Sequence, residues 1–216
     1  MKLLNSFGPN PRMVRMFLAE KGLTLEFEEV NMLGGDNRRP PYSDKNPGAQ
    51  MPALELDDGA VIGETVAICE YLEELNPAKA LIGATAEERA ETRMWIRRIE
   101  LGITELIYNG FRYSQGLDLF KDRMRCLPEA ADGLKAKAHD GLTWLDQLME
   151  GKDYICGDRF SAADIVLYCC LDFAAGVGQP RDTSLTNLDD WFERVNARES
   201  AAASLDPSSE AVGMRG

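Results

Sequence analysis

The sequence predicts a protein of two parts, a small α/β domain followed by an all-helical domain, and three observations support this prediction. Segments of strand-like composition are confined to residues 1–62. Every strong periodic signal beyond residue 84 is helical. Residues 77–84, between these regions, have the composition of a linker. We therefore expect domains at residues 1–77 and 85–205, in a chain of 216 residues that is long enough for a hydrophobic core.

The first thirty residues predict a strand, a helix and a second strand. Lys2–Asn5 is a short strand that enters Ser6–Pro11, where two prolines and a glycine force a loop and Pro11 suits the first turn of a helix. The helix has one face at 3.6-residue spacing, made of Val14, Phe17, Leu18 and Lys21. Gly22 then supplies its stop signal, and the alternation over 25–30 predicts the next strand.

The rest of the α/β part predicts a loop, a hairpin and a helix. Two glycines and two prolines in residues 34–41 leave room for a short helix at most. Residues 52–56 and 60–62 flank Asp57-Asp58-Gly59, whose residues tolerate the positive φ of a hairpin turn. Glu64 then opens a helix that Asn76-Pro77 ends.

The helical part carries two start signals and several apolar stripes. Thr85 and Glu88 have the spacing of a capping box, and Ser161 with Asp164 forms a second N-cap arrangement. The stripes consist of Trp95, Ile99, Gly102 and Leu106, then Leu134, Ala138, Leu142, Leu145 and Leu148, then Trp191, Phe192 and Val195. The tail from Ala201 onward is small and polar, so we expect it to be loosely ordered.

Composition limits the classes of partner and compartment. The net charge of −12, from 36 acidic and 24 basic residues, disfavours nucleic acid and membrane surfaces as partners. The start of the chain has no apolar run of a secretory signal, and five cysteines without a C-x-x-C pair are typical of a reducing compartment. These features predict a cytoplasmic protein. A lone histidine, His139, without a cysteine cluster argues against a metal site.

The segment from Asn46 to Leu54 is the first candidate binding feature. Pro52 stands between a loop and a strand, where a proline marks a sheet edge or a cis peptide. A cis bond would turn the backbone of Met51 outward, so that it pairs with an extended peptide as an added strand does. An ordinary turn before a hairpin is the alternative.

The second and third features are helix starts. At Gly63-Glu64-Thr65, a helix N-terminus with an acid and a hydroxyl suits a group that carries both a carboxylate and an ammonium; helix capping is the alternative. At Ser6–Pro11, a helix N-terminus with Ser6 and Asn10 as side-chain donors suits a thiolate; turn formation is the alternative.

Taken together, these motifs resemble those of a known family. Asn46-Pro47, Gln50–Leu54, Asp58-Gly59, Glu64-Thr65, Ala67-Ile68 and Tyr71-Leu72 look like the N-terminal signature of the soluble glutathione transferases, and residues 154–164 resemble the folding motif of their C-terminal domain. The resemblance covers the chain up to about residue 200. It implies a thioredoxin-like domain that binds glutathione, an all-helical domain that binds the acceptor, and a homodimer.

The resemblance also implies roles for individual residues. Glutathione would be held by the main chain of Met51 before cis-Pro52 and by Glu64 and Thr65 at its γ-glutamyl end. Gln50 and Arg39 would reach its glycyl carboxylate or its peptide backbone. The acceptor pocket would include Phe7, Tyr108 and Phe111. The chain resembles a fungal and bacterial subgroup without the usual catalytic tyrosine, serine or cysteine, which leaves Asn10, Ser6 and Tyr113 as candidates for activating the thiol.

The function that follows is detoxifying conjugation of the glutathione thiolate to small hydrophobic electrophiles, with glutathione as co-substrate and no metal. Bound thiolate would attack an electrophilic carbon after its pKa has been lowered. The alternative is a binding or scaffold protein of the same fold with little turnover. Glutathione-dependent peroxide or disulfide reduction is a third reading, which the lack of a C-x-x-C pair disfavours.

Overall fold

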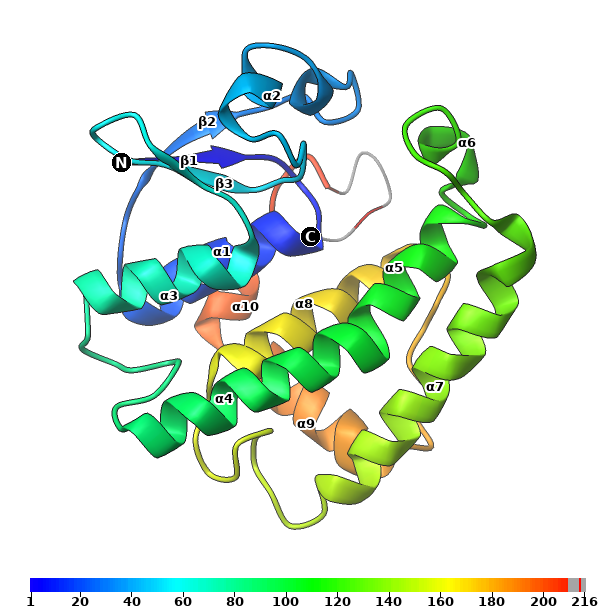
Figure 1. The fold of residues 1–216 in the computed structure, drawn as a ribbon. Helices are drawn as coiled ribbons and strands as arrows, with labels where there is room; N and C mark the ends of the chain where they lie inside the picture. Colours follow the sequence, from blue (N-terminus) through cyan, green and yellow to red (C-terminus); the bar gives the residue numbers. More distant parts are fainter. Residues whose placement is uncertain (210–213, 215–216) are drawn as a thin grey trace.

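The computed structural model describes residues 1–209 and 214 and contains an α/β part packed against a larger helical part (Figure 1). The α/β part contains β1 (Lys2–Asn5), α1 (Pro9–Lys21), β2 (Glu26–Glu29), η1 (Asp36–Arg38), α2 (Tyr42–Lys45), β3 (Ala53–Glu55), β4 (Val61–Ile62) and α3 (Thr65–Leu75). The helical part contains α4 (Ala86–Ile99), η2 (Glu100–Thr104), α5 (Glu105–Arg112), α6 (Leu117–Phe120), η3 (Pro128–Ala130), α7 (Ala131–Leu148), α8 (Ala162–Gly176), α9 (Thr186–Asn196) and α10 (Glu199–Ala203).

The sheet has the strand order β2-β1-β3-β4, with β1 and β2 parallel and the other pairs antiparallel. Alternation along β1 gives the sheet two covered faces: Leu3 packs into the large core with α1 and α3, whereas Leu4 packs with Tyr42 of α2 on the other side. Figure 1 shows α2 above the sheet and α1 and α3 below it, against the helical part. This mixed sheet followed by a helical bundle confirms the predicted fold class.

Local signals act in the structure as the sequence indicates. Gly22 ends α1 in the left-handed region at φ 69°, and Gly59 turns the β3–β4 hairpin at φ 87°. The capping boxes of Thr85 and Ser161 are both formed. The second one opens α8, in which every residue from Ala162 to Ala174 is buried. α8 therefore forms the centre of the core, and it contacts α1 and α4.

A buried carboxylate organises the connection between the two parts. Glu73, near the end of α3, accepts hydrogen bonds from the backbone N–H groups of Leu81 and Ile82 at 2.7 Å each, and from Gly83 at 3.2 Å. The Nζ atom of Lys21, at the end of α1, lies 3.1 Å from the same carboxylate and is fully buried. One side chain thus joins two helices and the connecting segment.

The expectation of a loosely ordered tail is wrong for the residues that the structure describes. α10 forms at residues 199–203, and Ser204 is fully buried. Arg15 of α1 donates from Nε to the carbonyl of Ser204 at 2.9 Å, and Arg12 donates to the carbonyl of Ala201 at 3.1 Å. Small residues here permit close packing on α1, a role that their composition does not reveal. Residues 210–213, 215 and 216 lie outside the described part.

Glu73→Gln should lower the free energy of unfolding by about 2–4 kcal/mol, because Lys21 loses its buried counter-ion and one acceptor oxygen is lost. Denaturant unfolding measures the change. Glu74→Gln is the matched control, since its side chain is exposed next to Glu73, and we expect a change within about 0.5 kcal/mol. Equal free energies of unfolding for the two variants would contradict the role given to Glu73.

Candidate functional site

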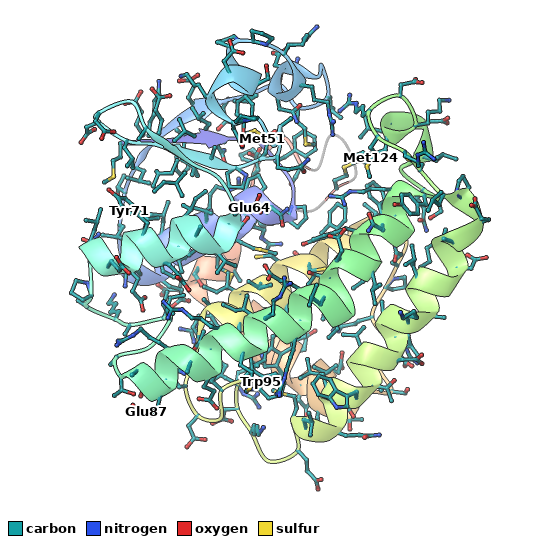
Figure 2. The ribbon with its side chains drawn as sticks, in the orientation of Figure 1. Met51, Glu64, Tyr71, Glu87, Trp95 and Met124 are labelled. Carbon is teal, nitrogen blue, oxygen red and sulfur yellow. The ribbon has the colours of Figure 1, made fainter. Side chains whose placement is uncertain are left out.

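A cleft of about 560 Å³ is lined by residues of both parts of the molecule. From the α/β part it receives the loop before β3 and the starts of α1 and α3, and from the helical part it receives α4, η2 and α5. Figure 2 shows Met51 and Glu64 on the side of the α/β part that faces these helices. Seven of the predicted site residues line it: Asn10, Gln50, Met51, Pro52, Glu64, Thr65 and Tyr108.

A smaller cavity of about 100 Å³, here called the side pocket, shares Asn10 and Met51 with the cleft. All three residues predicted for the acceptor line it: Phe7, Tyr108 and Phe111. Tyr108 is 8% exposed, and burial raises the pKa of its phenol well above the ordinary value, so the group stays protonated. The side pocket therefore presents mainly apolar and aromatic walls next to the cleft.

Side chains around the loop before β3 fix the backbone at Met51. The hydroxyl of Tyr42 and the amide of Asn46 both donate to the carbonyl of Gln50, the latter at 3.0 Å. The Met51–Pro52 peptide bond is cis, as is Pro40–Pro41. Because β3 begins only at Ala53, the backbone of Met51 lies outside the strand ladder, at the wall of the cleft.

The start of α3 has an unusual backbone. Glu64 is the N-cap residue with φ 65° and ψ 119°, a positive φ that costs a side-chain-bearing residue on the order of 1–3 kcal/mol. Its side chain makes no capping hydrogen bond to the helix. The geometry thus gives no support to the capping alternative, and it leaves a carboxylate and the first-turn N–H groups of α3 directed at the cleft.

Glu100 is a site residue that the sequence reasoning missed. It begins η2, a π-helical turn inserted between α4 and α5, and it lines the cleft with Arg97 and Thr104. Burial raises the pKa of the Glu100 carboxyl; Arg97 lowers it, and the nearby charge of Glu64 raises it again. Because a π turn has no clear sequence signature, periodicity alone treats this region as ordinary helix.

Of the three candidates for thiol activation, Asn10 alone lines the cavities. Asn10 lines both the cleft and the side pocket. Ser6 is 3% exposed and its carbonyl accepts from Arg15 at 2.9 Å; neither it nor Tyr113 is among the lining residues of the two cavities. Pro9 and Pro11 have no N–H group, so Asn10 supplies the one backbone donor among the first three residues of α1.

The two neighbouring arginines of the loop before α2 face different surroundings. Arg39 lies outside both cavities and forms an exposed ion pair with Asp36 at 2.5 Å. Arg38 lines the cleft and the side pocket. The sequence offers no signal to choose between adjacent residues in a loop without periodicity, and for this reason Arg38 was missed.

None of the cysteines lines the cleft or the side pocket. All five are free thiols, four of them buried, and burial raises the pKa of Cys169 to about 12. Within residues 1–209 and 214, no cluster of three or more metal-ligating side chains is arranged around one point. The described helices also include none with the length and apolar composition needed to cross a bilayer.

Comparison with known proteins identifies the family. Models described as the N-terminal and C-terminal domains of glutathione S-transferase match residues 7–75 and 128–194. Glutathione S-transferase 2 of Saccharomyces cerevisiae is 32% identical, over 92% of this chain and 86% of its own. The chain belongs to the glutathione S-transferase family. It is accordingly an enzyme of that family, with the family's thioredoxin-like and helical domains.

Two further similarities bear on this glutathione S-transferase. A crystal structure of a glutathione S-transferase domain-containing protein from Marinobacter aquaeolei is 36% identical, with a TM-score of 0.87, and the match covers 93% of this chain and 99% of that one. Maleylacetoacetate isomerase of Rattus norvegicus is 33% identical over 71% of this chain and 68% of its own.

Glu100→Gln should stabilise this glutathione S-transferase at neutral pH and not at acid pH. A carboxyl pKa that is raised by folding disfavours the folded state wherever the group ionises, so the penalty is absent below the unfolded pKa of about 4.3 and present above it. Thermal unfolding at pH 7 and near pH 4 tests this, with the exposed Glu150→Gln as control. An increase in stability of Glu100→Gln at pH 4 equal to that at pH 7 would contradict a raised pKa of the Glu100 carboxyl.

Proposed function

We propose that this protein binds glutathione in the cleft and transfers its thiolate to small electrophiles held in the side pocket. One observation carries the proposal: five of the six residues expected to hold glutathione, all except Arg39, line a single cleft. The side pocket with Phe7, Tyr108 and Phe111 adjoins the cleft beside Asn10, where the sulfur would lie. Catalysis would come from bringing the thiolate and the electrophile together.

The proposed pose matches each part of glutathione to its own group. The backbone of Met51 pairs with the cysteinyl residue as an added strand would. Glu64 and Glu100 hold the γ-glutamyl ammonium, while Thr65, the first turn of α3 and Arg97 hold the carboxylate beside it. Gln50 and Arg38 approach the glycyl carboxylate, because Arg38 faces the cleft whereas Arg39 pairs with Asp36.

Glu64→Gln should raise the KM for glutathione about tenfold to a hundredfold, because a charge-assisted hydrogen bond to the ammonium becomes a neutral one. Steady-state kinetics and calorimetric binding of glutathione measure this. Glu70→Gln, on α3 and outside the cleft, is the control. A glutathione affinity equal to that of the wild type would remove Glu64 from the binding site.

Thiol activation is proposed to rest on Asn10, in a chain that lacks the usual catalytic tyrosine, serine or cysteine. A lowering of about two pKa units, roughly 2.7 kcal/mol, would make the bound thiol mostly thiolate at neutral pH. The side-chain amide and the backbone N–H of Asn10 would each donate a charge-assisted hydrogen bond to the thiolate. Together with the dipole of α1, these two bonds could supply a stabilisation of that free energy. In this scheme Ser6, whose carbonyl accepts from Arg15, and Tyr113 do not contact the thiolate and act on it only through intervening groups.

Asn10→Ala should shift the acidic limb of the kcat/KM profile for the acceptor, at saturating glutathione, upward by about one pH unit, since the bound thiolate loses a donor. The pH–rate profile with an aryl halide is the measurement. Ser6→Ala is the companion variant, expected to keep the wild-type profile because Ser6 lies outside both cavities. An upward shift in Ser6→Ala without one in Asn10→Ala would reverse the assignment.

The alternative function is that of a glutathione-binding scaffold with little turnover. The two prolines in the first turn of α1 favour it, because they remove two of the N–H donors that could support a thiolate. The strained backbone at Glu64 disfavours it, because strain of this kind persists mainly at functional sites. Thermal stabilisation by glutathione without turnover of an aryl halide would establish the scaffold. The absence of both would sink the transferase proposal.

Three broader expectations also remain proposals. We propose the domain boundary between residues 77 and 85, where Glu73 binds the connecting segment. A cytoplasmic detoxifying role is consistent with five free thiols. A homodimer would cover Met94 and Leu101, two large apolar side chains on α4 and η2 that are 40% and 57% exposed.

A further inference from the structure

We propose that the side pocket selects electrophiles that carry a carboxylate beside an aromatic or unsaturated reacting group. This inference rests on the proposed transferase function and adds the class of acceptor. The protein carries a net charge of −12, yet the described residues that line the side pocket include three arginines and no aspartate or glutamate. The three are Arg38, Arg112 and Arg123.

The three arginines come from separate parts of the chain and converge on one cavity. Arg38 belongs to η1, Arg112 ends α5, and Arg123 lies between α6 and η3. Arg38 donates from Nη1 to the carbonyl of Arg123 at 3.0 Å, which joins the two loops. Burial and the neighbouring charges of Arg123 and Arg112 lower the pKa of Arg38. Like charges held together in this way attract an anion.

Among the described residues, Arg38 and Arg123 have no carboxylate partner. Arg123 donates to the carbonyls of Met32 and Leu33 at 3.0 and 2.6 Å, which are neutral acceptors. The Nε atom of Arg38 is buried and has no hydrogen-bond partner among the described residues. Buried donors of this kind gain most from an acceptor that enters the pocket.

Arg112 forms an ion pair with a carboxylate that does not line the side pocket. Its Nη1 atom lies 3.7 Å from Glu105, which is largely exposed and lines the cleft but not the side pocket. Nη1 also donates to the side chain of Asn109 at 3.1 Å. The guanidinium lies 5.9 Å from the ring centre of Tyr108 and 5.8 Å from that of Phe120. These rings hold it at the pocket wall, where a planar fork of donors matches a carboxylate.

The remaining walls define the rest of the acceptor. Phe111 and Phe173 meet edge to face, with ring centroids 5.2 Å apart, and Phe111 meets Phe120 in the same manner at 6.0 Å. Such walls suit a flat apolar group. A molecule with a reactive ring and a carboxylate satisfies both kinds of wall, whereas a wholly apolar one offers no acceptor to Arg112 and Arg123.

Glutathione itself does not use up this positive charge. Its γ-glutamyl end is assigned to the start of α3, and its glycyl carboxylate needs one cation, for which Arg38 faces the cleft. Arg123 lines the side pocket and not the cleft, whereas Arg112 lines both cavities and lies beside the rings of Tyr108 and Phe120. Two guanidinium groups therefore remain for an acceptor.

The test compares two acceptors of the same shape: a chloronitrobenzoate with chlorine para to the carboxylate, and its neutral carboxamide. In both reactions the glutathione sulfur forms a bond to the ring carbon, the carbon–chlorine bond breaks, chloride leaves, and the thiol proton goes to solvent. Each kcat/KM is divided by the uncatalysed rate constant to remove intrinsic reactivity. We expect the carboxylate to be preferred about tenfold or more.

Arg112→Gln should reduce this preference to within about twofold, and Arg125→Gln is the matched control. Arg125 lies on the same segment as Arg123, carries the same charge, is exposed, and lines neither cavity. A contrary result is that Arg112→Gln raises the KM for glutathione equally with both acceptors and keeps the wild-type preference for the carboxylate. That result would assign Arg112 to glutathione binding and overturn the inference.

Different results would contradict the acceptor class and the transferase function. Turnover of both acceptors by the wild type without a preference for the carboxylate would overturn the acceptor class and leave the transferase intact. No turnover of either acceptor would contradict the transferase function and the inference with it. A preference that Arg112→Gln abolishes and Arg125→Gln retains would support both.

Discussion

The buried guanidinium of Arg12 is the contact on which the arrangement of the two parts depends. It lies in the third position after Pro9 of α1 and is 0% exposed. It pairs with Asp172 of α8, donates to the hydroxyl of Tyr168 at 3.3 Å, and reaches the carbonyl of Ala201 in α10. A buried ion pair adds little net stability, but a side chain with several fixed partners allows one packing of the helices. Because α1 also carries Asn10, this contact sets where Asn10, at the wall of the cleft, lies relative to the helical part.

Once the two parts are fixed, the cleft acquires a separation of charge along its length. Glu64 and Glu100 lie at the start of α3 and at η2, where Arg97 also lines the cleft, whereas Arg38, Arg112 and Arg123 line the side pocket. In the proposed pose, the acidic residues would take the ammonium of glutathione, and the arginines would take carboxylates in the adjoining space. This polarity would orient glutathione with its γ-glutamyl end at α3 and its sulfur near Asn10. The strained backbone of Glu64 and the π turn at Glu100 are the two local departures from regular geometry that make the acidic end.

Features that depend on neighbouring residues could be predicted from the sequence, and features that depend on distant pairing could not. The capping boxes at Thr85 and Ser161, the stop at Gly22 and the β3–β4 hairpin each require only a few consecutive residues. The family resemblance predicted that the loop at Met51 and the start of α3 belong to one binding site. In contrast, Arg12 and Asp172 are 160 positions apart, and nothing local marks them as partners. The packing of Ser204 on α1 and the choice of Arg38 over Arg39 likewise depend on tertiary contacts.

The central claim is that the cleft binds glutathione and lowers the pKa of its thiol without a tyrosine, serine or cysteine at the sulfur. Ultraviolet absorbance of the thiolate, recorded while the enzyme–glutathione complex is titrated with base, measures this ionisation directly. The account predicts that bound glutathione ionises at a pH at least one unit below the ordinary thiol value of about 8.5. Bound glutathione that ionises at the same pH as free glutathione would contradict it.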